Sequence, residues 1–186
     1  MSVRSVAGRT PRIHPGAWVD PAALVIGDVE LAEGVSIWPF TVVRGDEGQH
    51  IRIGRNTNVQ DNSVVHVTPE QSCVIGEGVT IGHRAVVHAC TIGNNVRIGI
   101  GAVVLTGAVV EDNAQVGAGA VVAPNKVVPA GTLVMGVPAK PIRQMNEAEL
   151  DDIRRNAIEY LELWQRDYRD GGAPSMALPV DRVESP

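Results

Sequence analysis

The chain has 186 residues, a formal net charge of -5, 44% hydrophobic residues and 3% aromatic residues. This length predicts one domain, alone or with a short appendage. The acidic balance argues against a nucleic-acid partner and a polybasic membrane surface, because both need clustered Lys and Arg. No run approaches the roughly 18 apolar residues of a membrane span. Cys73 and Cys90 lie outside any C-x-x-C arrangement, which is typical of free thiols in a reducing cytoplasm.

An aliphatic residue recurs every six positions from Ile13 to Val134, with two longer interruptions and one interval of five residues, from Val87 to Ile92, which indicates a shortened corner. A period of six matches neither the 3.6 of a helix nor the 2 of an alternating strand. One short strand and one turn use about six residues, so three such units would close a triangular coil of eighteen. Successive coils would stack at the strand spacing of roughly 4.8 Å. The repeat therefore predicts an all-β hexapeptide parallel β-helix with its aliphatic side chains inside.

Two excursions of four extra residues interrupt this period. Val43 and Ile53 are ten residues apart, and so are Val65 and Ile75. Loops that leave a rigid scaffold commonly carry function. The two excursions are therefore candidate functional loops.

The repeat gives way to a different pattern near the C-terminus. Asn146 followed by Glu149 predicts a helix N-cap and capping box. Apolar residues at three- and four-residue spacing then predict a helix over residues 147–168 that packs along the prism wall. The predicted organisation is a β-helix domain (1–141), a C-terminal helix packed on it (142–170) and a flexible tail (171–186).

Three of the five histidines, His66, His83 and His88, lie in a stretch that otherwise carries mainly Val, Ile, Gly and Ala. The 22 residues between His66 and His88 equal one coil of eighteen plus one excursion. Their backbones should then lie about 4.8 Å apart on one face, so both imidazoles can share a metal ion. His83 belongs to the preceding face, and an extended run of five residues spans roughly 16 Å. One chain therefore cannot complete a three-histidine site.

A neighbouring copy can supply His83 if its face packs on the His66 and His88 face of the next copy. A closed ring of three prisms makes that heterologous contact three times. The same docking brings Asp61, expected directly below His83, near Arg44, expected one coil before His66. An arginine–carboxylate pair across the interface is then expected. Two independent pairings from one docking favour a homotrimer.

Each of these residues also has a purely structural interpretation. A lone His is more often structural than a ligand, and the two histidines outside the stretch are interpreted in this way. Arg44 and Asp61 could be a plain interface ion pair. The side chains of Gln60 and Asn58 could be turn amides.

The motifs R-G-D at residues 44–46, N-x-Q-D at 58–61, His66 and H-x-x-x-x-H at 83–88 together resemble the γ-class carbonic anhydrase family. The resemblance covers nearly the whole chain and is greatest to the short-loop bacterial branch. It implies a left-handed β-helix, an exception to the usual right-handed crossover. It also implies reversible hydration of CO2 to bicarbonate at the interfaces of a cytoplasmic homotrimer.

The resemblance implies that His66, His83 and His88 bind zinc, or alternatively Fe2+ or Co2+. Three neutral imidazoles and an open position lower the pKa of a zinc-bound water to about 7, which suits this reaction. Gln60 would hydrogen-bond the metal-bound water or bicarbonate, and Asn58 would line the same pocket. The implied interface ion network is Arg44, Asp46 and Asp61. Glu47 would carry protons away from the metal centre. Tyr160 would line the wall of the pocket.

After His66, the first of the three motif histidines, the chain departs from the sequence pattern of the family's founding members. The founding pattern has a long acidic loop with a shuttle glutamate, whereas this chain has only V-T-P-E-Q-S-C. Glu70 is the acidic residue of this short loop, and the sequence does not place it. Two alternatives stay open: a hexapeptide-repeat acyltransferase or thioesterase, which needs one general-base His, and an accessory trimer that retains a metal with little catalysis.

Overall fold

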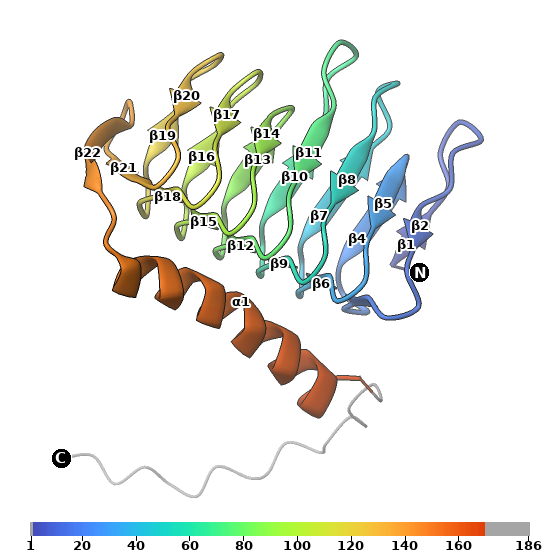
Figure 1. The fold of residues 1–186 in the computed structure, drawn as a ribbon. Helices are drawn as coiled ribbons and strands as arrows, with labels where there is room; N and C mark the ends of the chain where they lie inside the picture. The colour runs from blue at the N-terminus through green and yellow to red at the C-terminus, as the bar shows by residue number, and fades with distance from the viewer. Residues whose placement is uncertain (1, 170–186) are drawn as a thin grey trace, which may run out of the picture.

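Short parallel strands stack into three sheets that form the sides of a solenoid of about seven turns (Figure 1). The computed structural model describes residues 2–169. From β1 to β21, successive strands along the chain belong to successive sheets, so each strand from β1 to β18 pairs with the strand three further on. The predicted fold class, a parallel β-helix with a C-terminal helix, is confirmed.

The three sheets are named here by the order in which the chain enters them. The first sheet contains β1 (Val3–Arg4), β4 (Leu24–Gly27), β7 (Val42–Gly45), β10 (Val64–His66), β13 (Val86–His88), β16 (Val103–Val104) and β19 (Val121–Val122). The second sheet contains β2 (Arg12–Ile13), β5 (Val29–Leu31), β8 (Ile51–Ile53), β11 (Cys73–Ile75), β14 (Thr91–Ile92), β17 (Val109–Val110) and β20 (Val127–Val128). The third sheet contains β3 (Trp18–Val19), β6 (Ser36–Ile37), β9 (Asn58–Val59), β12 (Thr80–Ile81), β15 (Arg97–Ile98), β18 (Gln115–Val116), β21 (Thr132–Met135) and β22 (Lys140–Gln144).

The recurring aliphatic residues fill the interior of the solenoid. In the first sheet Val43, Val65, Val87 and Val104 are in register, and each is 0% exposed. Full burial of one such side chain stabilises the fold by about 1.5–3 kcal/mol. Because the interior repeats coil after coil, it fixes the register of every outward-facing side chain as well.

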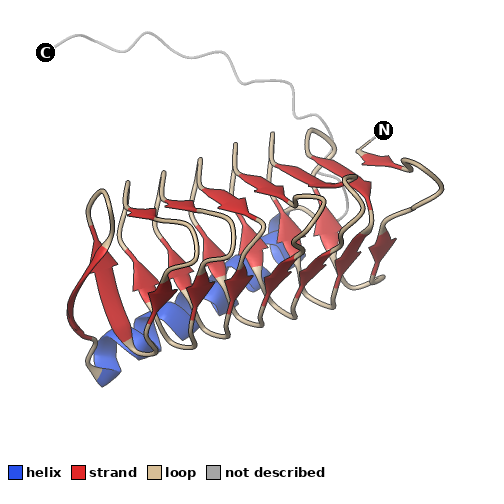
Figure 2. Cartoon of the chain, turned by 90° about the horizontal axis from the view of Figure 1, so that it is seen from above, coloured by secondary structure: helices blue, strands red, loops and turns tan. Residues whose placement is uncertain are grey.

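The C-terminal helix α1 (Glu147–Asp167) lies along the third sheet, as Figures 1 and 2 show. The predicted capping box is present: the Asn146 side chain accepts the backbone N–H of Glu149, and the Glu149 side chain accepts the backbone N–H of Asn146. The helix contacts β6, β9 and β12 and buries Ile153, Ala157 and Trp164. Within residues 2–169, no helix has the length and apolar character that crossing a membrane requires.

Two strands lie outside the range of the predicted repeat. Strand β1 precedes it, and β22 follows the expected exit turn and pairs antiparallel with β21. The turn reverses the chain so that β22 pairs with the free edge of β21, which would otherwise present unpaired backbone groups. Because β22 spans residues 140–144, it crosses the boundary proposed at residue 141. We keep the domain division as a proposal, and the predicted tail lies outside the described residues.

Candidate metal centre

His66 and His88 stack on the outer side of the first sheet. They are Cα partners in the neighbouring strands β10 and β13, as the spacing predicted. Nδ1 of His66 lies 3.4 Å from Nε2 of His88, and the ring centroids are 5.3 Å apart. Two nitrogens bound to one tetrahedral zinc at 2.0–2.1 Å would be about 3.3 Å apart. The observed separation therefore fits two ligands of one metal ion.

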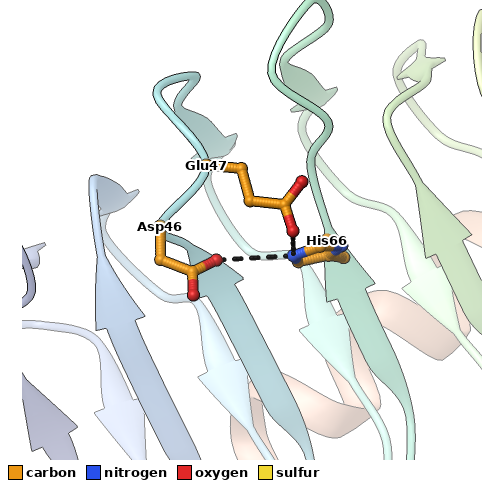
Figure 3. A group of neighbouring side chains, drawn as sticks. All are labelled: Asp46, Glu47 and His66. Carbon is orange, nitrogen blue, oxygen red and sulfur yellow. Dashed lines mark hydrogen bonds and ion pairs between the residues drawn. The ribbon is translucent and has the colours of Figure 1, made fainter.

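The second ring nitrogen of His66 faces two carboxylates (Figure 3). Nε2 lies 3.4 Å from Oδ1 of Asp46 and 3.6 Å from Oε1 of Glu47. Asp46, Glu47 and His66 each offer one ligand atom, and these atoms lie within 4.8 Å of one another. The excursion after β7 thus brings both Asp46 and Glu47 to the same imidazole.

Arg44 balances this acidic pair from one coil before His66, with which it is in register. Its Nη1 donates to both carboxylate oxygens of Asp46 at 2.7 Å. Burial raises the pKa of the Asp46 carboxyl, but the hydrogen bond and charge of Arg44 outweigh it and hold the pKa below its ordinary value. Asp46 is therefore a carboxylate that orients Arg44 and accepts from His66. The expected pairing of Arg44 with Asp61 needs a second copy and stays a prediction.

Thr106 contacts His88 from one coil further on, and sequence reasoning missed it. Its Oγ1 lies 2.9 Å from Nδ1 of His88. Burial and the neighbouring charge of His66 lower the pKa of His88 below its ordinary value. A lowered pKa favours the neutral imidazole, which is the form that binds metal ions. The period gave no signal for it: the coil after His88 has 17 residues, since Val87 pairs with Val104, so Thr106 lies one position beyond the register partner of His88.

His83 lies at the corner where the chain passes from the third sheet to the first. Asp61 occupies the same corner one coil earlier, as predicted, and Arg84 N–H donates to its carbonyl oxygen. Oδ2 of Asp61 lies 2.9 Å from Nδ1 of His83, whose side chain is 42% exposed. The carboxylate therefore holds one ring nitrogen, while the ring itself faces outward.

A pocket of about 360 Å³ lies beside His83 and is also lined by Gln60 and Tyr160. Burial, followed by the charge of Asp61, raises the pKa of Tyr160, so its phenol stays protonated. Gln60 is 4% exposed and donates from Nε2 to Oδ1 of Asn58 at 3.2 Å. Asn58 in turn donates to Oγ1 of Thr80 and is 1% exposed beneath α1. Asn58 is thus a hydrogen-bond partner of Gln60, and its place in the pocket of the metal centre stays a prediction.

The predicted residues therefore form two clusters on different parts of the surface, which we call the two half-sites of the candidate metal centre. One half-site contains Arg44, Asp46, Glu47, His66 and His88 on the first sheet. The other contains Asp61, His83 and Gln60 on the solenoid and Tyr160 on α1. Glu70 belongs to neither half-site and lines a separate pocket with Gln49 and Cys90.

The fold and the spacing of its repeats place the chain among hexapeptide-repeat β-solenoid proteins. Residues 89–124 match the family described as "Bacterial transferase hexapeptide (six repeats)". A solved structure of a hexapeptide transferase family protein from Anaplasma phagocytophilum superposes with a TM-score of 0.84 and 40% identity. That similarity covers 88% of this chain and 96% of the other.

Two curated relatives narrow the class of hexapeptide-repeat protein to which the chain belongs. "Gamma carbonic anhydrase 1, mitochondrial" from Arabidopsis thaliana is 37% identical over 98% of this chain and 68% of the plant protein. "Carbonic anhydrase" from Geobacillus kaustophilus (strain HTA426) is 38% identical over 85% of this chain and 86% of that protein. The chain belongs to the γ-carbonic anhydrase family.

Proposed function

We propose that three copies of the chain associate and that each interface joins the two half-sites into a metal centre that hydrates CO2 reversibly. His66 and His88 of one copy and His83 of its neighbour would hold the metal ion. The observation that carries the proposal is the 3.4 Å approach of His66 Nδ1 and His88 Nε2, with His83 absent from that face. The chain thus presents two aligned ligands in one place and an outward-facing third elsewhere.

The outer surface of the first sheet supports the association. An aliphatic column runs along it through six consecutive coils, two positions before the histidines. Its members are Leu24, Val42, Val64, Val86, Val103 and Val121. Contiguous apolar surface of this kind is typical of an interaction site.

The corner that carries His83 offers a complementary apolar surface. Backbone hydrogen bonds align Pro39, Asp61, His83 and Ile100 in successive coils at this corner. Phe40 is 66% exposed and Ile100 is 51% exposed, so apolar side chains flank the Asp61–His83 pair on both sides. Docking this corner on the aliphatic column of a neighbour would bury both surfaces and bring His83 to His66 and His88. A ring of three repeats this contact and closes.

The residues present fit a divalent transition metal. Three imidazoles suit Zn2+, Fe2+ or Co2+, and lowered basicity at His88 favours the ligating form. Bound with an open fourth position, such an ion supplies a Lewis acid that makes water nucleophilic near neutral pH. Asp61 fixes the ring of His83, and Arg44 and Asp46 fix the ring of His66.

The remaining residues position substrate and carry protons. Gln60, held by Asn58, presents its amide to the pocket beside His83, where it hydrogen-bonds a substrate oxygen. The protonated phenol of Tyr160 walls the same pocket. The carboxylate of Glu47 is 40% exposed and 3.6 Å from His66, so it reaches from the centre to solvent and accepts the proton. Glu70 lies elsewhere, so the short loop after His66 leaves this task to Glu47.

Two other functions remain candidates. The first is suggested by the transferases among hexapeptide proteins. An acyltransferase or thioesterase would use one of these histidines as a general base and would not need a metal. An accessory trimer would hold the metal and catalyse little. The metal content per chain separates the first alternative from our proposal, and the rate of CO2 hydration separates the second.

The test uses the anaerobically purified wild-type protein and the His83→Ala variant. We expect about one metal ion per chain in the wild type and none at the same site in the variant, together with CO2 hydration only in the wild type. Loss of one partner of a metal ligand typically lowers metal affinity 10- to 100-fold, so loss of the ligand should exceed that range. Equal metal content in both proteins, or acyl transfer that chelators do not inhibit, would contradict the proposal.

A further inference from the structure

Thr106 stands in a fixed position beside His88. Its carbonyl oxygen accepts Asn125 N–H at 3.0 Å, and the next residue, Gly107, donates to Ala89 O at 2.8 Å. The residue is thereby tied to the coil on either side. Threonine is β-branched and stiff at χ1, so a fixed backbone also restricts its hydroxyl. The result is a hydroxyl oxygen held 2.9 Å from Nδ1 of His88.

This contact bears on which nitrogen of His88 is free to bind a metal ion. A neutral imidazole carries one proton, so one ring nitrogen donates and the other offers a lone pair. Nε2 of His88 is the nitrogen that faces His66. It can act as a ligand only when the proton lies on Nδ1, where the oxygen of Thr106 can accept it.

We propose that Thr106 is a positioning residue for the metal centre: it accepts the Nδ1–H of His88 and thereby fixes the tautomer and the ring orientation that direct Nε2 at the metal. The inference rests on the proposed function, and neither the motifs nor the sequence spacing assigned a role to this residue. Asp61 makes the equivalent contact with His83 from the coil before. The two orienting residues thus come from opposite directions along the solenoid.

Two substitutions separate hydrogen bonding from packing. Thr106→Val keeps the shape and removes the acceptor, whereas Thr106→Ser keeps the acceptor and removes a methyl group. Zinc affinity of the intact protein is measured by competition with a chromophoric chelator. We expect Thr106→Val to weaken zinc binding 10- to 100-fold and Thr106→Ser to stay within about threefold of the wild type.

A matched control is Thr91→Val, since Thr91 is an exposed threonine on the second sheet. It should leave zinc affinity unchanged. If Thr106 only packed the corner, the order would reverse, with Thr106→Val like the wild type and Thr106→Ser impaired. That order, or equal affinity of all variants, would overturn the inference.

A second measurement does not depend on the folding of any variant. Nitrogen-15 spectra of histidine-labelled, zinc-loaded wild-type protein report which ring nitrogen of His88 carries the proton. We expect the proton on Nδ1, and a proton on Nε2 would overturn the inference. The failure of the proposed function looks different: the wild type and His88→Ala would then bind zinc equally weakly.

Discussion

The first and third sheets of this solenoid have the same interior and opposite exteriors. The third sheet is covered by α1, beneath which Asn58 and Gln60 are buried and hydrogen-bonded. The first sheet has no such cover within residues 2–169, and its outer surface carries an aliphatic column beside His66 and His88. Because the repeat builds three sheets with equivalent interiors, the sheets differ in function through what covers the outer surface of each. The third sheet is covered by a helix of the same chain, and we propose that the first sheet is covered by another copy.

The largest expected effect comes from placing a charge on the outer surface of the first sheet. Val64, 37% exposed, lies in the middle of the aliphatic column. Val64→Glu should convert the trimer to folded monomers, because burial of an unpaired carboxylate costs several kcal/mol at each interface. Sedimentation analysis measures the association, and circular dichroism checks the fold.

The matched control for this variant is Val127→Glu on the second sheet, where Val127 is 58% exposed. It should remain trimeric, because the proposed docking leaves the second sheet free. Dissociation of both variants, or of neither, would show that the first sheet is not the interface.

A smaller effect is expected from weakening the packing of α1 on the third sheet. Trp164 is 3% exposed and stacks on Trp18, with ring planes 7° apart and centroids 6.4 Å apart. Trp164→Ala should lower the free energy of unfolding by about 3–5 kcal/mol, as large-to-small core substitutions do. Urea denaturation measures the change.

Two further variants sharpen this expectation. Trp164→Phe should cost less than Trp164→Ala, since it keeps part of the aromatic packing and Nε1 of Trp164 has no hydrogen-bond partner in the part of the chain that the structure describes. Ile158→Ala, at a position 50% exposed on the same helix, should change stability by less than about 1 kcal/mol. A loss from Ile158→Ala as large as that from Trp164→Ala would mean that the helix docks through a different face.

The smallest effect concerns the pH dependence of the helix start. Hydrogen bonds from Arg143 and from the backbone of Asn146 lower the pKa of Glu149 to about 2 from an ordinary value of 4.5. The folded chain therefore binds this proton less readily than the unfolded chain. The stabilisation is present above pH 4.5 and is lost as the pH falls from 4.5 towards 2.

The variant Glu149→Gln can still accept the Asn146 N–H but does not titrate. Its thermal midpoint should therefore fall less steeply with acidification over that range than that of the wild type. Identical slopes for both proteins would show that the capping carboxylate does not couple to folding of the solenoid.

The repeat made part of this arrangement predictable from sequence. A fixed period of eighteen, plus excursions of countable length, places His66 on His88 and Asp61 below His83. The helix start followed from Asn146 and its capping box. Each of these depends on backbone register or on a local hydrogen bond.

The remainder depends on geometry that periodicity does not define. The excursion after β7 brings Glu47 to His66, and its conformation is set by loop contacts rather than by the repeat. Ala89 adopts a left-handed φ of 46° at the shortened corner, and this corner helps to set the approach of Thr106 to His88. Whether Asn58 faces solvent or a helix likewise depends on the docking of α1.

The central claim is that the metal centre is shared between copies, and mixing two inactive variants tests it most directly. Co-assembled His83→Ala and His66→Ala chains should regain CO2 hydration and metal binding, because each mixed trimer contains one interface with all three histidines. The control mixture of His66→Ala and His88→Ala should regain nothing, because both losses fall on the same half-site. Recovery in the control mixture, or none in the first mixture once mixed trimers are shown to form, would contradict the account.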